Sequence, residues 1–180
     1  RIGVVTSPGG AAIRDVLTVL KRRCPSIPVV IYPVPVQGTT AAAEISDMLR
    51  LADRRRECDL LILTRGGGSL EDLMAFNDEG LARTIAGLSI PLSSAVGHEI
   101  DTSISDHVAD RRAPTPSAAA ELASPDSAAL LERINLLGTR LQRSQTQGLQ
   151  RGMQRLDELG IRLQQQHPGV RLRQQAERIG

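Results

Sequence analysis

The sequence predicts an α/β protein: an open parallel sheet with helices on both faces, flavodoxin-like or Rossmann-like, followed by an extended α-helical coiled-coil arm. Four short apolar runs alternate with segments of helical periodicity, which is the pattern of βαβ units. The two middle runs are almost continuously apolar, as expected of strands covered on both faces. From residue 125 onward the apolar residues instead recur at intervals of three and four, which is typical of coiled coils.

The predicted strands are residues 2–6, 28–32, 60–64 and 90–96. Between them, apolar residues spaced three and four apart indicate three amphipathic helices. The first carries Ile13, Val16, Leu17 and Leu20, the second Ile45, Met48, Leu49 and Ala52, and the third covers residues 78–88 with Leu81 and Ile85 on one side. These elements place an α/β catalytic domain at residues 1–124.

Two short helices are expected after the fourth strand. Residues 102–112 form the first, because Ser103 and Asp106 have the spacing of a capping box. Thr115 before Pro116 predicts the start of the second, at residues 117–122. The sequence then changes character, and residues 125–180 are predicted to be the helical arm.

The apolar seam of the predicted arm has two phases: Leu130, Ile134, Leu137 and Leu141, then Leu149, Met153, Leu156 and Leu163. Four glycines (138, 148, 152 and 160) weaken this helix by about 1 kcal/mol each relative to Ala. We therefore expect another chain to cover the seam. Residues 166–169 interrupt the pattern, and Val170 restarts it.

Charge and composition limit the classes of function. Residues 1–124 hold 13 Lys and Arg against 15 Asp and Glu, a net of −2, whereas residues 125–180 hold 9 against 5, a net of +4. Any affinity for a polyanion that comes from bulk charge thus belongs to the arm. Cys24 and Cys58 stand alone, which favours a reduced, cytoplasmic protein. Neither a membrane-spanning run nor a signal peptide is present, so we expect no membrane partner.

Three strands end in glycine-rich or sharp turns, at residues 6–10, 64–69 and 96–101. Because the carboxyl ends of parallel strands line the ligand crevice of an open sheet, these turns should converge. Glycine lets backbone N–H groups approach an anion closely, and a following helix adds its positive N-terminal dipole. The candidate phosphate-binding residues are Ser7, Gly9, Gly10, Gly66, Gly67, Gly68, Ser69 and Gly97.

Four side chains are candidates for catalysis. Arg65 lies between a buried strand and three glycines, where a ligand-binding role is more common than a solvated one. His98 follows Gly97 at a strand end and suits proton transfer near neutral pH. Asp101 could orient His98, or serve as the N-cap of the next helix. Asp15 faces away from the apolar stripe of its helix, and its pattern alone indicates a solvated residue.

Several motifs together resemble the large subunit of exonuclease VII: RIGVVTS at 1–7, LKRR at 20–23, YP at 32–33, VQG at 36–38, RGGGSLEDL at 65–73, FNDE at 76–79, SAVGHEID at 94–101, APTPSAAAE at 113–121 and RLQQQHP at 162–168. The resemblance implies a DNase that degrades single-stranded DNA from either end and releases oligonucleotides with 5′-phosphates. The family's functional positions fall on Asp15, Arg65, His98 and Asp101. The resemblance also implies an N-terminal OB-type domain, absent from this sequence, and several copies of a small helical subunit on the arm. We expect both ends of the sequence to be cuts in a longer protein.

The leading hypothesis is hydrolysis of phosphodiester bonds. Arg65 and the amides of Gly66 to Gly68 would hold the scissile phosphate, while His98 acts as general base, general acid or nucleophile. Asp15 would hold a water molecule or assist Arg65. The resemblance implies no obligatory metal ion, although Asp15, Glu71, Asp72, Glu99 and Asp101 could hold Mg²⁺. Two alternatives remain: an enzyme that binds a nucleotide or sugar phosphate, and a non-catalytic scaffold for a helical arm.

Overall fold

The computed structural model describes residues 1–66, 70–96, 102–165 and 168–179. It divides into two compact units, Arg1–Ala128 and Ala129–Gly180. Each unit is described by itself.

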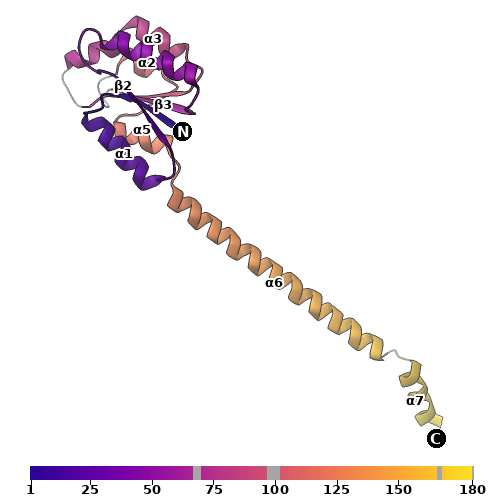
Figure 1. The fold of residues 1–180 in the computed structure, drawn as a ribbon. Coiled ribbons are helices and arrows are strands. Elements are labelled where there is room, and N and C mark those ends of the chain that lie inside the picture. Colours follow the sequence, from indigo (N-terminus) through magenta and orange to yellow (C-terminus); the bar gives the residue numbers. More distant parts are fainter. Residues whose placement is uncertain (67–69, 97–101, 166–167, 180) are drawn as a thin grey trace. The chain divides into compact units, whose positions relative to one another are not determined.

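A five-stranded parallel sheet forms the centre of the first unit (Figure 1). Its strands are β1 (Ile2–Thr6), β2 (Val29–Pro33), β3 (Leu60–Thr64), β4 (Leu92–Ala95) and β5 (Arg111–Arg112), in the spatial order β2-β1-β3-β4-β5. Every neighbouring pair is parallel, and Val4 of β1 lies between Ile31 of β2 and Ile62 of β3. The predicted α/β class with a parallel sheet is confirmed.

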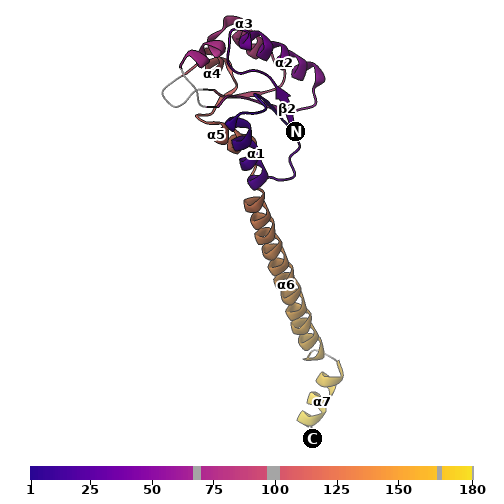
Figure 2. The same ribbon diagram turned by 60° about the vertical axis from the view of Figure 1, so that its left-hand side comes forward.

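One face of the sheet is covered by α1 (Ala11–Arg23) and α5 (Pro116–Ala123), which lie side by side in Figures 1 and 2. Because successive strand residues point to opposite faces, Val4 and Ile62 pack with this pair of helices. Small residues of α5, Ala119 and Ala120, are fully buried there and allow close packing on the sheet.

The other face is covered by α2 (Ala41–Arg55), the 3₁₀ helix η1 (Leu70–Asn77) and α3 (Glu79–Ala86) (Figure 2). The core on this side is aliphatic, with Val5, Leu61 and Leu63 from the strands. The single Phe and the single Tyr of the sequence, Phe76 and Tyr32, are buried in the same layer. The prediction of helices on both faces is confirmed.

The region after β4 differs from the prediction of one helix over residues 102–112. The helix α4 covers only Ile104–Val108, because Ala109 adopts an extended conformation. The chain then forms β5, where Arg111 pairs with Ser93 and Arg112 with Ser94. The strand is held in register because the Asp110 carboxylate accepts a hydrogen bond of 2.8 Å from the Leu92 N–H.

Three smaller predictions were wrong by one or a few residues. The strand β2 covers Val29–Pro33 rather than 28–32, and β4 is shorter than 90–96. In α1 the apolar face includes Val19, which is 8% exposed, rather than Leu17, which is 37% exposed. The predicted helix starts are confirmed, since Ser103 and Asp106 form a capping box and Thr115 accepts a hydrogen bond from the Ala118 N–H.

The C-terminal part consists of α6 (Ser127–Gln165) and α7 (Pro168–Ile179), so the prediction that it is helical is confirmed. The four glycines do not break α6, whose 39 residues include none that is buried. The second helix begins at Pro168, two positions before the predicted restart at Val170. No helix within the described residues is both long enough and apolar enough to cross a membrane.

Candidate active site

The carboxyl ends of β1 and β3 lie next to each other, because these strands are neighbours in the sheet. After β1 the chain turns to α1 on one face, whereas after β3 it continues to η1 and α3 on the other. The reversal opens a crevice between the two strand ends, and ligands of open α/β sheets bind at such points. The predicted phosphate-binding turns after β1 and β3 therefore meet at one edge.

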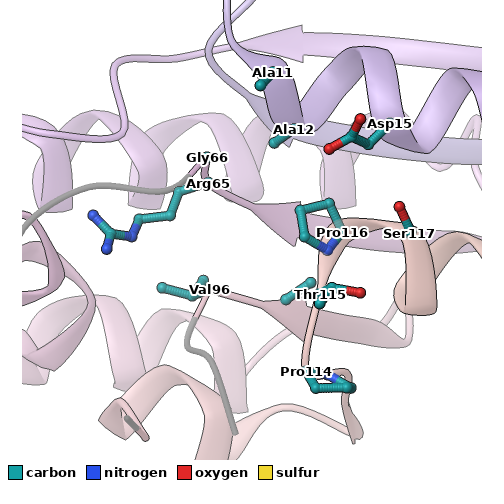
Figure 3. Close-up of a pocket in the computed structure, with 11 residues that line it drawn as sticks. Ala11, Ala12, Asp15, Arg65, Gly66, Val96, Pro114, Thr115, Pro116 and Ser117 are labelled. Carbon is teal, nitrogen blue, oxygen red and sulfur yellow. The ribbon is translucent and has the colours of Figure 1, made fainter. Parts of the chain in front are cut away.

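A cavity of about 280 Å³ lies at this edge, within the first unit (Figure 3). Asp15 reaches it from α1, Arg65 and Gly66 from the end of β3, and Val96 from the end of β4. Residues 114–117, which lead into α5, also line it and lie below Asp15 in Figure 3, on the side away from the Arg65 guanidinium. The structure thus brings together Asp15 and Arg65, which are 50 positions apart in the sequence.

Arg65 is buried, with 6% of its surface exposed. In Figure 3 its guanidinium group points away from the Asp15 carboxylate, so the two charged groups lie apart although both residues line the cavity. A guanidinium remains charged at any physiological pH and can bind two phosphate oxygens at once. Because water screens a buried charge poorly, Arg65 would interact strongly with an anion that enters this cavity.

A second cavity of about 350 Å³ extends the site towards β2. Arg65 and Gly66 line this cavity as well as the first, and Ser7 and Gly10 line it from the turn after β1. Its remaining lining residues are Thr6, Ala11, Pro35, Val36 and Gln37. The two cavities share the end of β3, so an extended ligand such as a chain of phosphates could occupy both.

The N-terminus of α1 faces this shared region. Its N-cap, Gly10, has no side chain to bond the first amides of the helix. Among the described residues, the nearest neighbour of a Cβ atom added to Gly66 would be the Ala12 nitrogen, 4.0 Å away. No described residue fills the gap between Gly66 and the first turn of α1, and the helix dipole favours negative charge there.

The other predicted site residues have different outcomes. Gly9 is exposed and lines neither of the two cavities. Six further residues lie outside the part of the chain that the structure describes: Gly67, Gly68, Ser69, Gly97, His98 and Asp101. Val96, the last described residue before His98, lines the first cavity.

Residues 114–117 were predicted as the start of a helix and not as part of the site. Thr115 and Ser117 line the first cavity with Asp15, although they are 100 or more positions away in the sequence. Packing of α5 beside α1 brings them there. The Thr-Pro pattern gave a capping signal, and the family motifs APTPSAAAE and VQG included these residues and Gln37 without assigning them a role in the site.

Asp15 is the one described carboxylate that lines the first cavity. Among the described residues, no group of three or more His, Cys, Asp or Glu side chains is arranged to hold a metal ion. Of the five carboxylates named above as Mg²⁺ ligands, Glu99 and Asp101 lie outside the described residues, and the placement of the Glu71 and Asp72 side chains is not described.

These features define an α/β protein whose sheet edge is suited to an anionic ligand. The whole chain, residues 1–180, matches the family model "Exonuclease VII, large subunit". The chain belongs to this family.

Relatives named "Exodeoxyribonuclease 7 large subunit" are similar over most of the chain. The protein from Alcanivorax borkumensis is 64% identical over 141 residues, 78% of this chain and 32% of the relative. The one from Nitrosomonas europaea is 55% identical over 175 residues, 97% of this chain and 39% of the relative. The one from Shewanella baltica is 56% identical over 179 residues, 99% of this chain and 40% of the relative. The chain thus spans about a third to two fifths of their length.

Proposed function

We propose that this chain carries the catalytic site of an exodeoxyribonuclease that hydrolyses phosphodiester bonds of single-stranded DNA from either end. Membership of the exonuclease VII large subunit family supports the activity. The observation that carries the proposal is the placement of Arg65, a 6% exposed cation, in one cavity with Asp15 beside the N-terminus of α1. A buried cation with converging backbone amides suits a phosphate diester.

Arg65 and the Gly66 amide would hold the non-bridging oxygens of the scissile phosphate. The transition state carries additional negative charge on these oxygens, and a fixed cation stabilises it without reorganising solvent. The dipole of α1 would add to this stabilisation, because its first turn faces the same gap.

The chemical step is attack of water on phosphorus and cleavage of the bond to the 3′ oxygen, which leaves the phosphate on the 5′ end of the product. His98 would take the proton from the water or give one to the leaving oxygen, and direct nucleophilic attack by His98 is the alternative. Asp101 would orient the imidazole. Asp15 would hold the water molecule or assist Arg65.

We propose that no metal ion is obligatory, because Arg65 can stabilise the developing charge. Carboxylates such as Asp15 could still hold Mg²⁺ as an activator. Activity should then persist in a chelator and respond at most moderately when Mg²⁺ is added back.

The strand order 2-1-3-4-5 supports a flavodoxin-like assignment of the α/β unit. For α6 we propose a coiled coil in which the small subunit, in several copies, covers the apolar seam. The exposure of that seam supports this: Leu149 and Leu156 are both 70% exposed and Leu163 is 74% exposed. Single-stranded DNA would be the second partner.

The test is nuclease activity on labelled single strands by the full-length large subunit assembled with its small subunit. Arg65→Ala and His98→Ala should each lower kcat by about 10²- to 10⁴-fold, as expected for a charge stabiliser and a proton-transfer group. Arg83→Ala is the matched control, since Arg83 is an exposed arginine of α3 paired with Glu79, and it should retain activity.

Near-normal turnover by folded, assembled His98→Ala would overturn the mechanism. A wild-type assembly with no nuclease activity that still binds nucleotides would favour the nucleotide- or sugar-phosphate-binding alternative. An assembly with neither property would favour the scaffold alternative.

A further inference from the structure

A buried carboxylate, that of Asp106, does not line either cavity of the candidate site but lies close to it in sequence. Asp106 of α4 is 5% exposed, and its side chain is fully buried. One of its oxygens accepts a hydrogen bond of 2.6 Å from the Ser94 hydroxyl. The other accepts two bonds of 2.9 Å, from the hydroxyl and the backbone N–H of Ser103. A single side chain thus joins the end of β4 to the start of α4.

The two serines stand on either side of the segment that carries His98 and Asp101. Eight residues separate Ser94 from Ser103. If its two ends were not held together, a segment of this length could span roughly 30 Å when fully extended. Asp106 instead holds both ends at one carboxylate, so it removes much of the freedom that the ends of this segment would otherwise have.

The hydrogen bond from Ser94 to Asp106 is not explained by helix capping. Ser103 and Asp106 form a capping box, which by itself would explain their mutual hydrogen bonds. A capping box does not need a residue 12 positions earlier in a neighbouring strand. Ser94 is completely buried, and its backbone is also fixed, because its carbonyl accepts a bond of 2.8 Å from the Ala113 N–H.

The same end of α4 is tied to the segment that follows Arg65. The Ile104 N–H donates to the side-chain oxygen of Asn77, and the Ser105 hydroxyl donates to the Phe76 carbonyl, both at 2.8 Å. Asn77 and Phe76 belong to η1. The start of α4 therefore connects the chain after β3 with the chain after β4, the two segments that supply Arg65 and His98.

The charge of Asp106 is partly balanced. The Arg112 Nε atom lies 4.0 Å from the carboxylate oxygen that Ser103 also binds. A buried carboxylate that accepts three hydrogen bonds and lies near a cation is costly to move, because any displacement leaves a buried charge without its partners. This makes Asp106 a rigid anchor.

We propose that Asp106 is a positioning residue for the nuclease reaction: by binding Ser94 and Ser103 together, it fixes the two ends of the segment that carries His98 and Asp101. The inference rests on the proposed function. Misplacement of a reacting group by about 1 Å can cost on the order of 100-fold in rate. Loss of the anchor should therefore act on the chemical step and not on binding of the DNA strand.

The test is Asp106→Asn in the full-length large subunit assembled with its small subunit. Asparagine keeps the size of the side chain, but it removes the charge and replaces one of the two accepting oxygens with a donor, so the charge-assisted bond from Ser94 or from Ser103 is lost. We expect kcat on single-stranded DNA to fall by about 10- to 100-fold while KM changes by less than about threefold. The pH dependence of kcat should also be displaced, because His98 would lie in a different environment.

Asp53→Asn is the matched control. Asp53 likewise accepts three hydrogen bonds, from the Ser89 N–H, the Ser89 hydroxyl and the Ile90 N–H, but it ties α2 to the chain before β4 rather than after it. It should lower stability without changing kcat, KM or the pH profile at a temperature where the protein is folded. Wild-type kinetics for Asp106→Asn, or an equal loss in Asp53→Asn, would overturn the proposal.

If the Asp106→Asn protein does not fold, the variants Ser94→Ala and Ser103→Ala provide a second test of the proposal. Each removes one hydroxyl and keeps the carboxylate, and each should lower kcat by about 3- to 10-fold with the same small effect on KM. Wild-type turnover in both would also overturn the proposal. Its failure is distinct from failure of the proposed function, which is judged by the wild-type assembly and by His98→Ala.

Discussion

Apolar side chains differ in exposure between the two units of this chain. In the α/β unit, Leu49, Leu61 and Leu63 are completely buried, whereas Leu149 and Leu156 of α6 are both 70% exposed. The first set is stabilised by removal from water within the unit itself. The helix α6 has no buried residue, so it gains little from that term and depends more on helix propensity. Its apolar seam would contribute more if another chain covered it.

The largest expected difference between the units is the loss of stability when one apolar side chain in each is truncated to alanine. Phe76→Ala should lower the free energy of unfolding of the α/β unit by about 3–5 kcal/mol, because Phe76 is 0% exposed and its removal leaves a cavity. Leu149→Ala in α6 should change it by less than about 0.5 kcal/mol. Urea unfolding of this chain measures both, since Tyr32 is its single Tyr, it has no Trp, and Tyr32 fluorescence therefore reports on the α/β unit.

If Leu149→Ala lowered the free energy of unfolding as much as Phe76→Ala in this chain alone, the contrast between the two units would be wrong. Such a result would mean that the apolar seam of α6 is buried without a partner chain. Addition of the small subunit sharpens the contrast. Leu149→Ala should weaken binding of the small subunit, and Phe76→Ala should not as long as the α/β unit is folded. Copurification of the two subunits provides the measurement.

A second, smaller effect is that a glycine-to-alanine substitution should change stability in opposite directions in the two units. A Cβ atom at Gly3 of β1 would lie 2.5 Å from a Leu61 methyl group, so Gly3→Ala should destabilise the α/β unit by about 1–3 kcal/mol. A Cβ atom at Gly152 of α6 would meet no described residue within 4 Å, so Gly152→Ala should stabilise the helix by about 0.5–1 kcal/mol. Urea unfolding and helical circular dichroism provide the two readings, and a gain in stability for Gly3→Ala would contradict the close packing at β1.

The strength of the hydrophobic pattern explains which elements the sequence predicted. The strands β1 and β3 have the predicted bounds because each is an apolar run with both faces buried. The strand β5 was missed, since it consists of two exposed arginines and is defined only by pairing with β4. Such a strand carries no apolar periodicity, and the preceding capping box correctly indicated a helix that ends sooner than expected.

The candidate site was predictable to the extent that strand ends define it. Arg65 and Gly66 were found because glycines follow a buried strand, and the sheet places them at its carboxyl edge. Asp15 could not be assigned from its own pattern, because it is exposed on α1 and only the cavity shows what it faces. Thr115 and Ser117, and the bond from Ser94 to Asp106, depend on helix and strand packing between distant segments.

The smallest expected effect is a pH dependence that belongs to the α/β unit alone. Hydrogen bonds from Ser89, first from its hydroxyl and then from its N–H, lower the pKa of Asp53, as does the bond from the Ile90 N–H. A carboxylate whose pKa is lower in the folded protein stabilises it above the unfolded pKa of about 3.9, and that stabilisation is lost as the pH falls through the folded value. Asp53→Asn should thus lower the free energy of unfolding by roughly 1 kcal/mol or less at pH 7. It should have no measurable effect at a pH where the Asp53 carboxyl is protonated in both the folded and the unfolded protein.

Asp157→Asn, which removes an exposed carboxylate of α6, is the matched control and should show no difference in urea midpoint at either pH. An Asp53→Asn penalty that grows as the pH falls would contradict the sign of this argument.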